Sequence, residues 1–215
     1  MDPHALGSLR AASVVVRFPP QSNLFHEGES PEFLHLLLEG TVELYSEHNG
    51  QALGFSIQRP SSAFILAAVL LDAPYLNSAC TLERSDLLLI PAQPFRTAIE
   101  NERALARAVE TETALAYRGM MRELKNHKFR PAVERLANWL LRHMDQNGCE
   151  GTVNIPFSKR KLASHIGTTP ENLSRLFAEL TAVGVCARSA QQIFIENTAA
   201  LAAFARPDPL IDGTN

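Results

Sequence analysis

Two short helices joined by a tight turn are encoded between Ser158 and Leu180, and this segment restricts the fold of the 215-residue chain more than any other. Ser158 is a good N-cap for the first helix, because its hydroxyl can accept a hydrogen bond from an unpaired backbone N–H. Gly167 can end that helix in a left-handed conformation. Thr169 then caps a second helix with Pro170 at its first position, where the missing N–H of proline costs nothing. The segment therefore predicts a helix-turn-helix.

The outward face of the second helix begins with side chains that form hydrogen bonds: Glu171, Asn172, Ser174 and Arg175. A helix in the DNA major groove needs such groups near its N-terminus, where an arginine can bond to guanine and a glutamate can accept from the cytosine amino group. Ser158, Lys159 and Thr169, at the helix starts, are suited to phosphate contacts. Residues 183–185 and 192–196 are expected to form a small β-wing. An ordinary helical hairpin is the alternative interpretation.

Short strands separated by turn residues dominate the first half of the chain. They are expected at residues 12–18, 33–38, 41–45, 52–57 and 86–90. Asn49-Gly50 is suited to a type I′ hairpin between two of them. This pattern is typical of an antiparallel sandwich or barrel. The apolar run 64–71 contains good helix formers, so we expect a short helix against the inside of the barrel, with a buried strand as the alternative.

A long helix is expected over residues 94–129, where Gly119 is the only glycine and Pro94 suits the helix start. Apolar and small side chains recur every three or four residues along it: Leu105, Val109, Thr113, Ala116, Met120 and Leu124. This spacing is close to that of a coiled coil. We expect the last five to form a dimer interface, since a helix this long would extend past one barrel. Packing of the helix on its own barrel is the alternative.

Composition excludes several classes of protein. The chain has 20 Lys and Arg against 23 Asp and Glu, a net charge of -3, so a uniformly basic nucleic-acid coat is excluded but a local basic patch is not. Its longest apolar run has eight residues, too few to cross a membrane, and we expect no membrane partner. The N-terminus does not resemble a signal peptide. Cys80, Cys149 and Cys186 are scattered and odd in number, which favours a reducing cytoplasm over a disulfide framework.

Motifs of enzymes are missing from the sequence. It has no G-x-x-x-x-G-K phosphate loop, no G-x-S-x-G elbow and no His-x-His pair with a glutamate at metal-ligand spacing. We therefore expect neither an enzyme nor a metal site. A DNA-binding regulator is the first hypothesis, and a ligand-sensing regulatory module that does not bind DNA is the alternative.

Motifs in both halves resemble those of the CRP/FNR superfamily of bacterial transcription regulators. The N-terminal match is Phe18-x5-Leu24-Phe25-x2-Gly28-Glu29 followed by Gly40-x-Val42-x-Leu44, and the C-terminal match is the E-x-x-S-R pattern of Glu171, Ser174 and Arg175. The resemblance extends from about residue 12 to residue 200. It implies that Ser174 contacts a thymine methyl, Arg175 a guanine, and Glu171 a cytosine amino group on the opposite strand, in TTGAT-like half-sites.

The resemblance also implies an α+β architecture. It predicts an effector-sensing antiparallel β-barrel (a jelly roll like that of cyclic-nucleotide-binding proteins) at 1–95, a dimerisation helix at 96–129, a winged helix-turn-helix at 130–205 and a flexible tail at 206–215. It further implies a cytoplasmic homodimer that binds a palindromic DNA operator, has RNA polymerase as a partner and is controlled by a small-molecule effector.

Two departures from the family pattern bear on the effector. Where cyclic-AMP-binding members carry a glutamate and an arginine, this chain has Ala67 or its neighbours and Asn77, so the phosphate would lose its charge-assisted partner. We expect an effector other than cyclic AMP, in an apolar pocket lined by five residues: Phe64, Leu66, Ala67, Leu70 and Asn77. No cysteine precedes Cys80, so the iron–sulfur cluster of FNR-type members is not expected.

Segment 64–75 looks similar to the nitric-oxide-responsive denitrification-regulator branch, some members of which use haem. Haem needs an axial ligand. The candidates are His4, His26, His35, His48 and the more remote His127, and the sequence assigns the role to none of them. Haem therefore stays a candidate cofactor, and the identity of the cofactor is unknown at this point.

Overall fold

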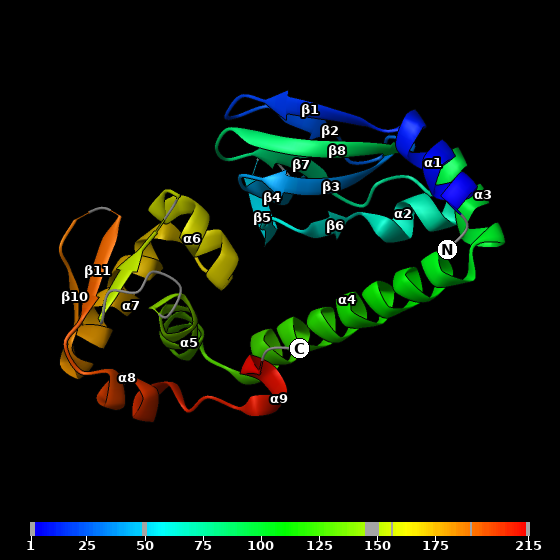
Figure 1. The fold of residues 1–215 in the computed structure, drawn as a ribbon. Coiled ribbons are helices and arrows are strands. Elements are labelled where there is room, and N and C mark those ends of the chain that lie inside the picture. Colours follow the sequence, from blue (N-terminus) through cyan, green and yellow to red (C-terminus); the bar gives the residue numbers. More distant parts are fainter. Residues whose placement is uncertain (1–2, 49–50, 145–150, 156, 190, 214–215) are drawn as a thin grey trace. The chain divides into compact units, whose positions relative to one another are not determined.

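The computed structural model describes residues 3–48, 51–144, 151–155, 157–189 and 191–213. The chain forms two compact units, Met1–Leu115 and Ala116–Asn215, which we describe separately (Figure 1). The two units contain the elements of the predicted α+β fold: a two-sheet antiparallel β-fold, a long helix and a winged helix-turn-helix. No helix in the described part of the chain combines the length and apolar character needed to cross a membrane.

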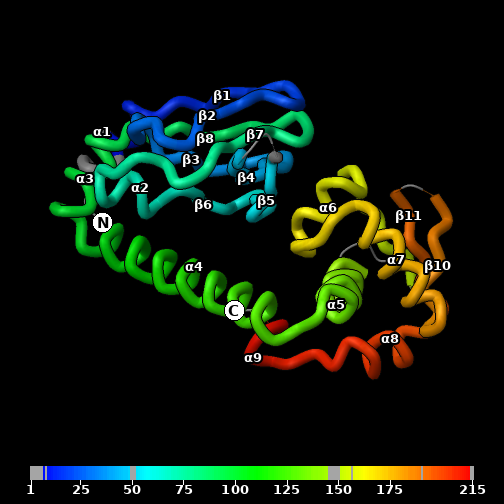
Figure 2. Tube along the Cα trace, turned by 180° about the vertical axis from the view of Figure 1, so that it is seen from behind, coloured from blue at the N-terminus to red at the C-terminus, as the bar shows by residue number. Residues whose placement is uncertain are grey.

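The first unit contains two four-stranded antiparallel sheets, which can be followed from behind in Figure 2. One sheet has the order β1 (Val14–Phe18), β8 (Ser85–Pro91), β3 (Phe33–Glu39), β6 (Ser62–Phe64). The other has the order β2 (Asn23–Phe25), β7 (Ser78–Thr81), β4 (Val42–His48), β5 (Gln51–Gln58). The sequence missed the three short strands β2, β6 and β7. The predicted Asn49-Gly50 turn lies outside the described residues.

The start of the chain differs from the prediction. Residues 12–18 were expected to be one strand, but Ala12 ends the helix α1 (Pro3–Ala12) and β1 begins only at Val14. Leu9 of α1 is buried in an apolar cluster with Leu34, Val69 and Phe95. The helix is therefore stabilised by packing against residues distant in sequence, which the local pattern does not reveal.

The short helix expected at 64–71 is present as α2 (Leu66–Leu71), so the alternative of a buried strand is wrong for these six residues. Phe64 instead ends β6. Ile65 and Asp72 flank α2 in the left-handed conformation, with φ of 59° and 50°. A β-branched residue such as Ile65 rarely adopts this conformation.

The single long helix expected over 94–129 is in fact two helices, α3 (Ala92–Asn101) and α4 (Arg103–Phe129). Glu102 separates them in an extended conformation, with φ −117° and ψ 96°. Phe95 of α3 and Val109 of α4 are buried in the same apolar cluster. One straight helix could not bring both to that cluster, so the chain changes direction between them. The long helix therefore begins at Arg103.

The second unit contains the helix-turn-helix and its wing as predicted. α4 leads into α5 (Ala132–Met144), and the sheet order is β10 (Val185–Ala187), β11 (Gln192–Ile195), β9 (Thr152–Asn154). The two central helices are α6 (Lys159–Ile166) and α7 (Pro170–Leu180), and the 3-10 turn η2 (Thr181–Val183) follows them. Fully buried side chains from these elements, including Leu140, Leu162 and Leu173, form the core.

The C-terminal end is more ordered than expected. After α8 (Thr198–Ala205), residues of the predicted flexible tail form the short helix α9 (Pro209–Asp212), in which Ile211 is buried. Asp212 is bonded to Arg130 at the end of α4. The expectation of a flexible tail is corrected for residues 207–213, because a buried ion pair with a residue far away in the sequence holds them.

Candidate nucleic-acid interface

The turn between α6 and α7 has the local geometry that the sequence predicted. Ser158 Oγ accepts a hydrogen bond from the backbone N–H of Lys161, and Thr169 Oγ1 accepts one from Asn172 at 3.2 Å. Gly167 ends α6 with φ 70°, in the left-handed region. These caps satisfy backbone groups that a helix end leaves unpaired. Each of these cap bonds joins residues only three positions apart in the sequence.

All six residues predicted to contact DNA are exposed: Ser158, Lys159, Thr169, Glu171, Ser174 and Arg175. Leu173, Leu176 and Leu180 are buried on the opposite face of α7. This separation of an apolar and a polar face confirms the periodicity predicted for the helix, while the contacts with DNA stay predictions. The exposed face of α7 is therefore available for a ligand.

Three side chains on the exposed face of α7 differ in the hydrogen-bonding groups that they present to a ligand. Arg175 makes no ion pair or hydrogen bond with the described residues, so its donors are free for a base edge. The pKa of Glu171 lies below its usual range because its own backbone N–H and the Thr169 hydroxyl bond to the carboxylate. Glu171 is thus an acceptor at neutral pH. The hydroxyl of Ser174 donates to the carbonyl of Pro170 at 3.2 Å, which turns it toward its own helix.

A basic cluster lies at the start of α6. Lys159, Arg160 and Lys161 occupy its first turn, which contains no acidic residue. The helix dipole makes this end electropositive, so three cations there are unfavourable unless an anion is bound. Lys159 Nζ lies 5.8 Å from the centre of the Phe177 ring, within the range of a cation–π contact. The cluster favours contact with a polyanion such as the DNA backbone.

The wing adds a basic residue that the sequence analysis did not select. Arg188 follows β10, is exposed, and stacks its guanidinium 3.8 Å above the Phe194 ring. The sequence could have indicated this residue, because it is a basic residue in the short turn between the two wing strands. The stacking holds its charge at the edge of the domain, where it can contact a phosphate.

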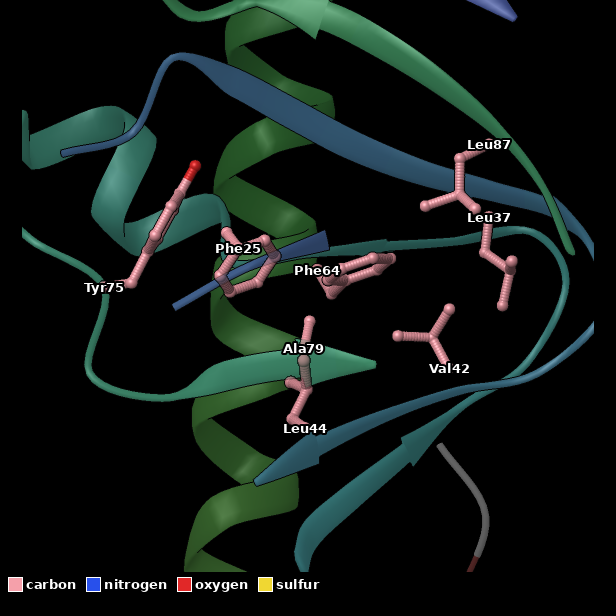
Figure 3. Close-up of a cluster of buried hydrophobic side chains, with 8 residues drawn as sticks. All are labelled: Phe25, Leu37, Val42, Leu44, Phe64, Tyr75, Ala79 and Leu87. Atoms are coloured by element: carbon pink, nitrogen blue, oxygen red, sulfur yellow. The ribbon is translucent and has the colours of Figure 1, made fainter. Parts of the chain in front are cut away.

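The structure does not bring together the five residues predicted to line one effector pocket, and the pocket itself stays a prediction. Phe64 points into the space between the two sheets, beside Phe25 and Ala79 (Figure 3). Leu66 and Leu70 pack against the other apolar cluster, which includes Leu34 and Phe95. Ala67 is exposed and Asn77 is partly buried. The reason is that Phe64 belongs to a strand, whereas the helical turn of α2 directs Leu66 and Leu70 away from the sandwich.

An aromatic cluster occupies the interior of the sandwich. His35 is 5% exposed, and its ring centre lies 5.1 Å from that of Phe25 and 5.5 Å from that of Phe64. Tyr75 lies 4.2 Å from Phe25 and completes the cluster (Figure 3). Burial lowers the pKa of His35 to about 4, and its Nδ1 has no hydrogen-bond partner among the described residues. Among the described residues of the first unit, no arginine or lysine that could hold a phosphate is buried.

Haem does not fit the histidines in this arrangement. Phe25 and Phe64 crowd the ring of His35, which leaves no room beside it for a porphyrin. His26, His48 and His127 are exposed, and the side chain of His4 lies outside the described residues. No group of three metal-ligating side chains is found in the part of the chain that the structure describes.

The five residues predicted to form the dimer interface do not share one environment. Val109 is buried with Leu9 and Phe95 inside its own unit, so it is not available for a partner. Thr113, Ala116, Met120 and Leu124 are exposed, with Met120 at 66% and Leu124 at 50%. Tyr117, which the sequence analysis did not select, is 61% exposed on the same helix. An apolar surface of this kind on a long helix is typical of an interface.

Comparisons with known proteins agree with this architecture. Residues 15–102 match the family of cyclic nucleotide-binding domains, and residues 134–204 match the Crp-like helix-turn-helix domain. None of the curated proteins matches the chain.

Similar solved structures cover nearly the whole chain. FixK2 from Bradyrhizobium japonicum is 21% identical, with a TM-score of 0.75, over 89% of this chain and 96% of that one. A CooA mutant from Carboxydothermus hydrogenoformans is 15% identical, with a TM-score of 0.76, over 93% and 90%. A CRP-family transcriptional regulator from Thermus thermophilus is 18% identical, with a TM-score of 0.75, over 93% and 100%. With a cyclic nucleotide-binding domain ahead of a Crp-like helix-turn-helix, the chain belongs to the CRP/FNR family of transcription regulators.

Proposed function

We propose that the protein is a cytoplasmic homodimer that binds a palindromic DNA operator with TTGAT-like half-sites and responds to a small effector other than cyclic AMP. The observation that carries the proposal is the exposed polar face of α7, with Glu171, Ser174 and Arg175 opposite a buried apolar face. Major-groove recognition needs these hydrogen-bonding groups at the N-terminal end of an exposed helix.

In this proposal Glu171, Ser174 and Arg175 of α7 each contact a different base. Arg175 donates two hydrogen bonds to a guanine, and Glu171 accepts one from the cytosine amino group on the opposite strand. Ser174 contacts a thymine methyl through its Cβ, which fits a hydroxyl already bonded to Pro170. Ser158, Lys159 and Thr169 contact phosphates and set the register of the helix on the duplex.

Two copies of the chain would bind the two half-sites. The exposed residues Thr113, Ala116, Met120 and Leu124 of α4 form the proposed dimer interface. A dimer of this kind places its recognition helices about 34 Å apart, the repeat of one DNA turn. RNA polymerase is the proposed partner of the DNA-bound dimer.

The interior of the sandwich supports an uncharged effector. A buried phosphate needs a cationic partner, and no arginine or lysine is buried among the described residues of the first unit. A cyclic nucleotide is therefore a poor fit. The nitric-oxide-responsive branch stays a prediction from resemblance, and the packing around His35 gives no support for haem.

Binding of fluorescent DNA tests the proposal. Arg175→Ala should weaken binding to a TTGAT-type palindrome by about 1–3 kcal/mol and relax the preference at one base position. Lys159→Ala is the matched control, since it should weaken all sequences alike and reduce the slope of the salt dependence by about one. Equal affinity of Arg175→Ala and the parent protein contradicts the assigned contact. A parent protein that binds no DNA even at low salt would favour the ligand-sensing module.

A further inference from the structure

A buried ion pair connects the C-terminal segment of the chain to the junction between α4 and α5. Arg130 Nη1 donates to Asp212 Oδ1 at 2.8 Å, and Arg130 Nη2 donates to Asp212 Oδ2 at 2.6 Å. The side chains are 6% and 11% exposed. Arg130 Nη1 also lies 3.3 Å from Oδ1 of Asn126 in the last turns of α4. This two-point geometry specifies orientation as well as distance.

Asp212 is itself held in place by the residues before it. Its Oδ2 accepts a hydrogen bond from the backbone N–H of Asp208 at 2.8 Å, and Asp208 Oδ1 caps the N–H of Leu210. Burial alone would raise the pKa of Asp212, but the hydrogen bonds from Arg130 and from the Asp208 N–H hold it below its usual range. The carboxylate is therefore charged and ordered at neutral pH.

A second arginine continues this network to the turn before α7. Arg135, buried in α5, donates through Nη1 to the carbonyl of Arg130 at 2.7 Å. Its Nε donates to the carbonyl of Ile166 at 2.8 Å and its Nη2 to that of Gly167 at 3.2 Å. Asp212, Arg130, Arg135 and the end of α6 thus form one continuous hydrogen-bonded path.

We propose that residues 207–213 are a latch that fixes the α4–α5 junction, and that Asp212 and Arg130 are positioning residues for the recognition helix α7. This inference rests on the proposed function, because α4 carries the proposed dimer interface and α7 the proposed base contacts. A loose junction would have to be ordered each time DNA is bound, which weakens binding. The latch removes that cost for every DNA sequence equally, since it touches no base.

The first test needs no DNA. Asp212→Asn in the full chain keeps the shape of the side chain but leaves the buried Arg130 without its counter-charge. Backbone N–H groups at the junction, such as those of Arg130 and Arg135, should exchange about tenfold faster with deuterium. The exchanged pair Arg130→Asp with Asp212→Arg should recover part of the protection. Asp86→Asn is the matched control, since it breaks a similar two-point pair with Arg17 in the first unit.

The second test measures DNA affinity. Asp212→Asn should bind the palindrome about tenfold more weakly with the same ranking of base substitutions, whereas Arg175→Ala changes that ranking. Unchanged exchange at the junction overturns the latch. Faster exchange with unchanged affinity overturns the positioning role. If the parent protein binds no DNA, the proposed function fails, and the exchange experiment alone decides whether the latch exists. Circular dichroism checks that Asp212→Asn is folded, and Asp212→Glu supplies a second variant that keeps the charge.

Discussion

At the scale of single residues, His35 couples the stability of the sandwich to pH. Its pKa is about 4 in the folded protein, because burial disfavours the charged imidazole, against an ordinary value of 6.5. Between these values the unfolded chain binds more protons than the folded chain. The stabilisation is therefore present above about pH 6.5 and is lost as the pH falls toward 4. A shift of this size corresponds to about 3 kcal/mol.

We predict that urea unfolding of the first unit, followed by the near-ultraviolet circular dichroism of its aromatic cluster, shows this loss between pH 7 and pH 4.5. His35→Leu should remove most of the dependence, because no imidazole remains to be protonated. His26→Gln, at an exposed histidine, should keep it. A parent protein with the same free energy of unfolding at both pH values contradicts the prediction.

At the scale of the elements, two glycines in helical segments should respond to alanine in opposite directions. A Cβ at Gly167, where φ is 70°, would lie 2.6 Å from Cε1 of His127, so Gly167→Ala should destabilise the second unit by about 1 kcal/mol or more. Gly119 lies within α4, and a Cβ there would meet nothing within 4 Å. Gly119→Ala should stabilise the helix by about 0.5–1 kcal/mol. Urea unfolding followed by the fluorescence of Trp139 measures both, and shifts of the same sign would refute the argument.

The elements also differ in how far the sequence predicts them. The caps Ser158, Gly167 and Thr169 act within a few residues, so the helix-turn-helix and the exposure of its six proposed contact residues could be predicted. The break at Glu102 could not, since no glycine or proline marks it and packing on a shared cluster determines it. The same holds for α9, which depends on an ion pair between residues 82 positions apart. The sequence also could not show that Leu66 and Leu70 pack in a different cluster from Phe64, because the side on which α2 presents each residue depends on where β6 ends.

At the scale of the whole molecule, recognition of a palindrome depends on the surface of α4. Met120 and Leu124 are exposed at adjacent turns, and Val109, two turns before Ala116, is buried within its own unit. The proposed interface is therefore confined to α4 from Thr113 onward. A linked pair of DNA-binding domains gains affinity because the second contact becomes intramolecular, typically by a factor of about 100 or more.

We predict that Met120→Glu combined with Leu124→Glu converts a dimer into a monomer, because two charged side chains per copy would be buried against each other. Sedimentation equilibrium should give the mass of two chains for the parent protein and of one for the variant. Affinity for the palindrome should fall about 100-fold, while affinity for a single half-site should change little. Leu76→Glu, at an 86% exposed leucine outside α4, is the control and should stay dimeric. If the double variant has the parent's mass, the two copies meet through another surface, and the spacing of the recognition helices must be set elsewhere.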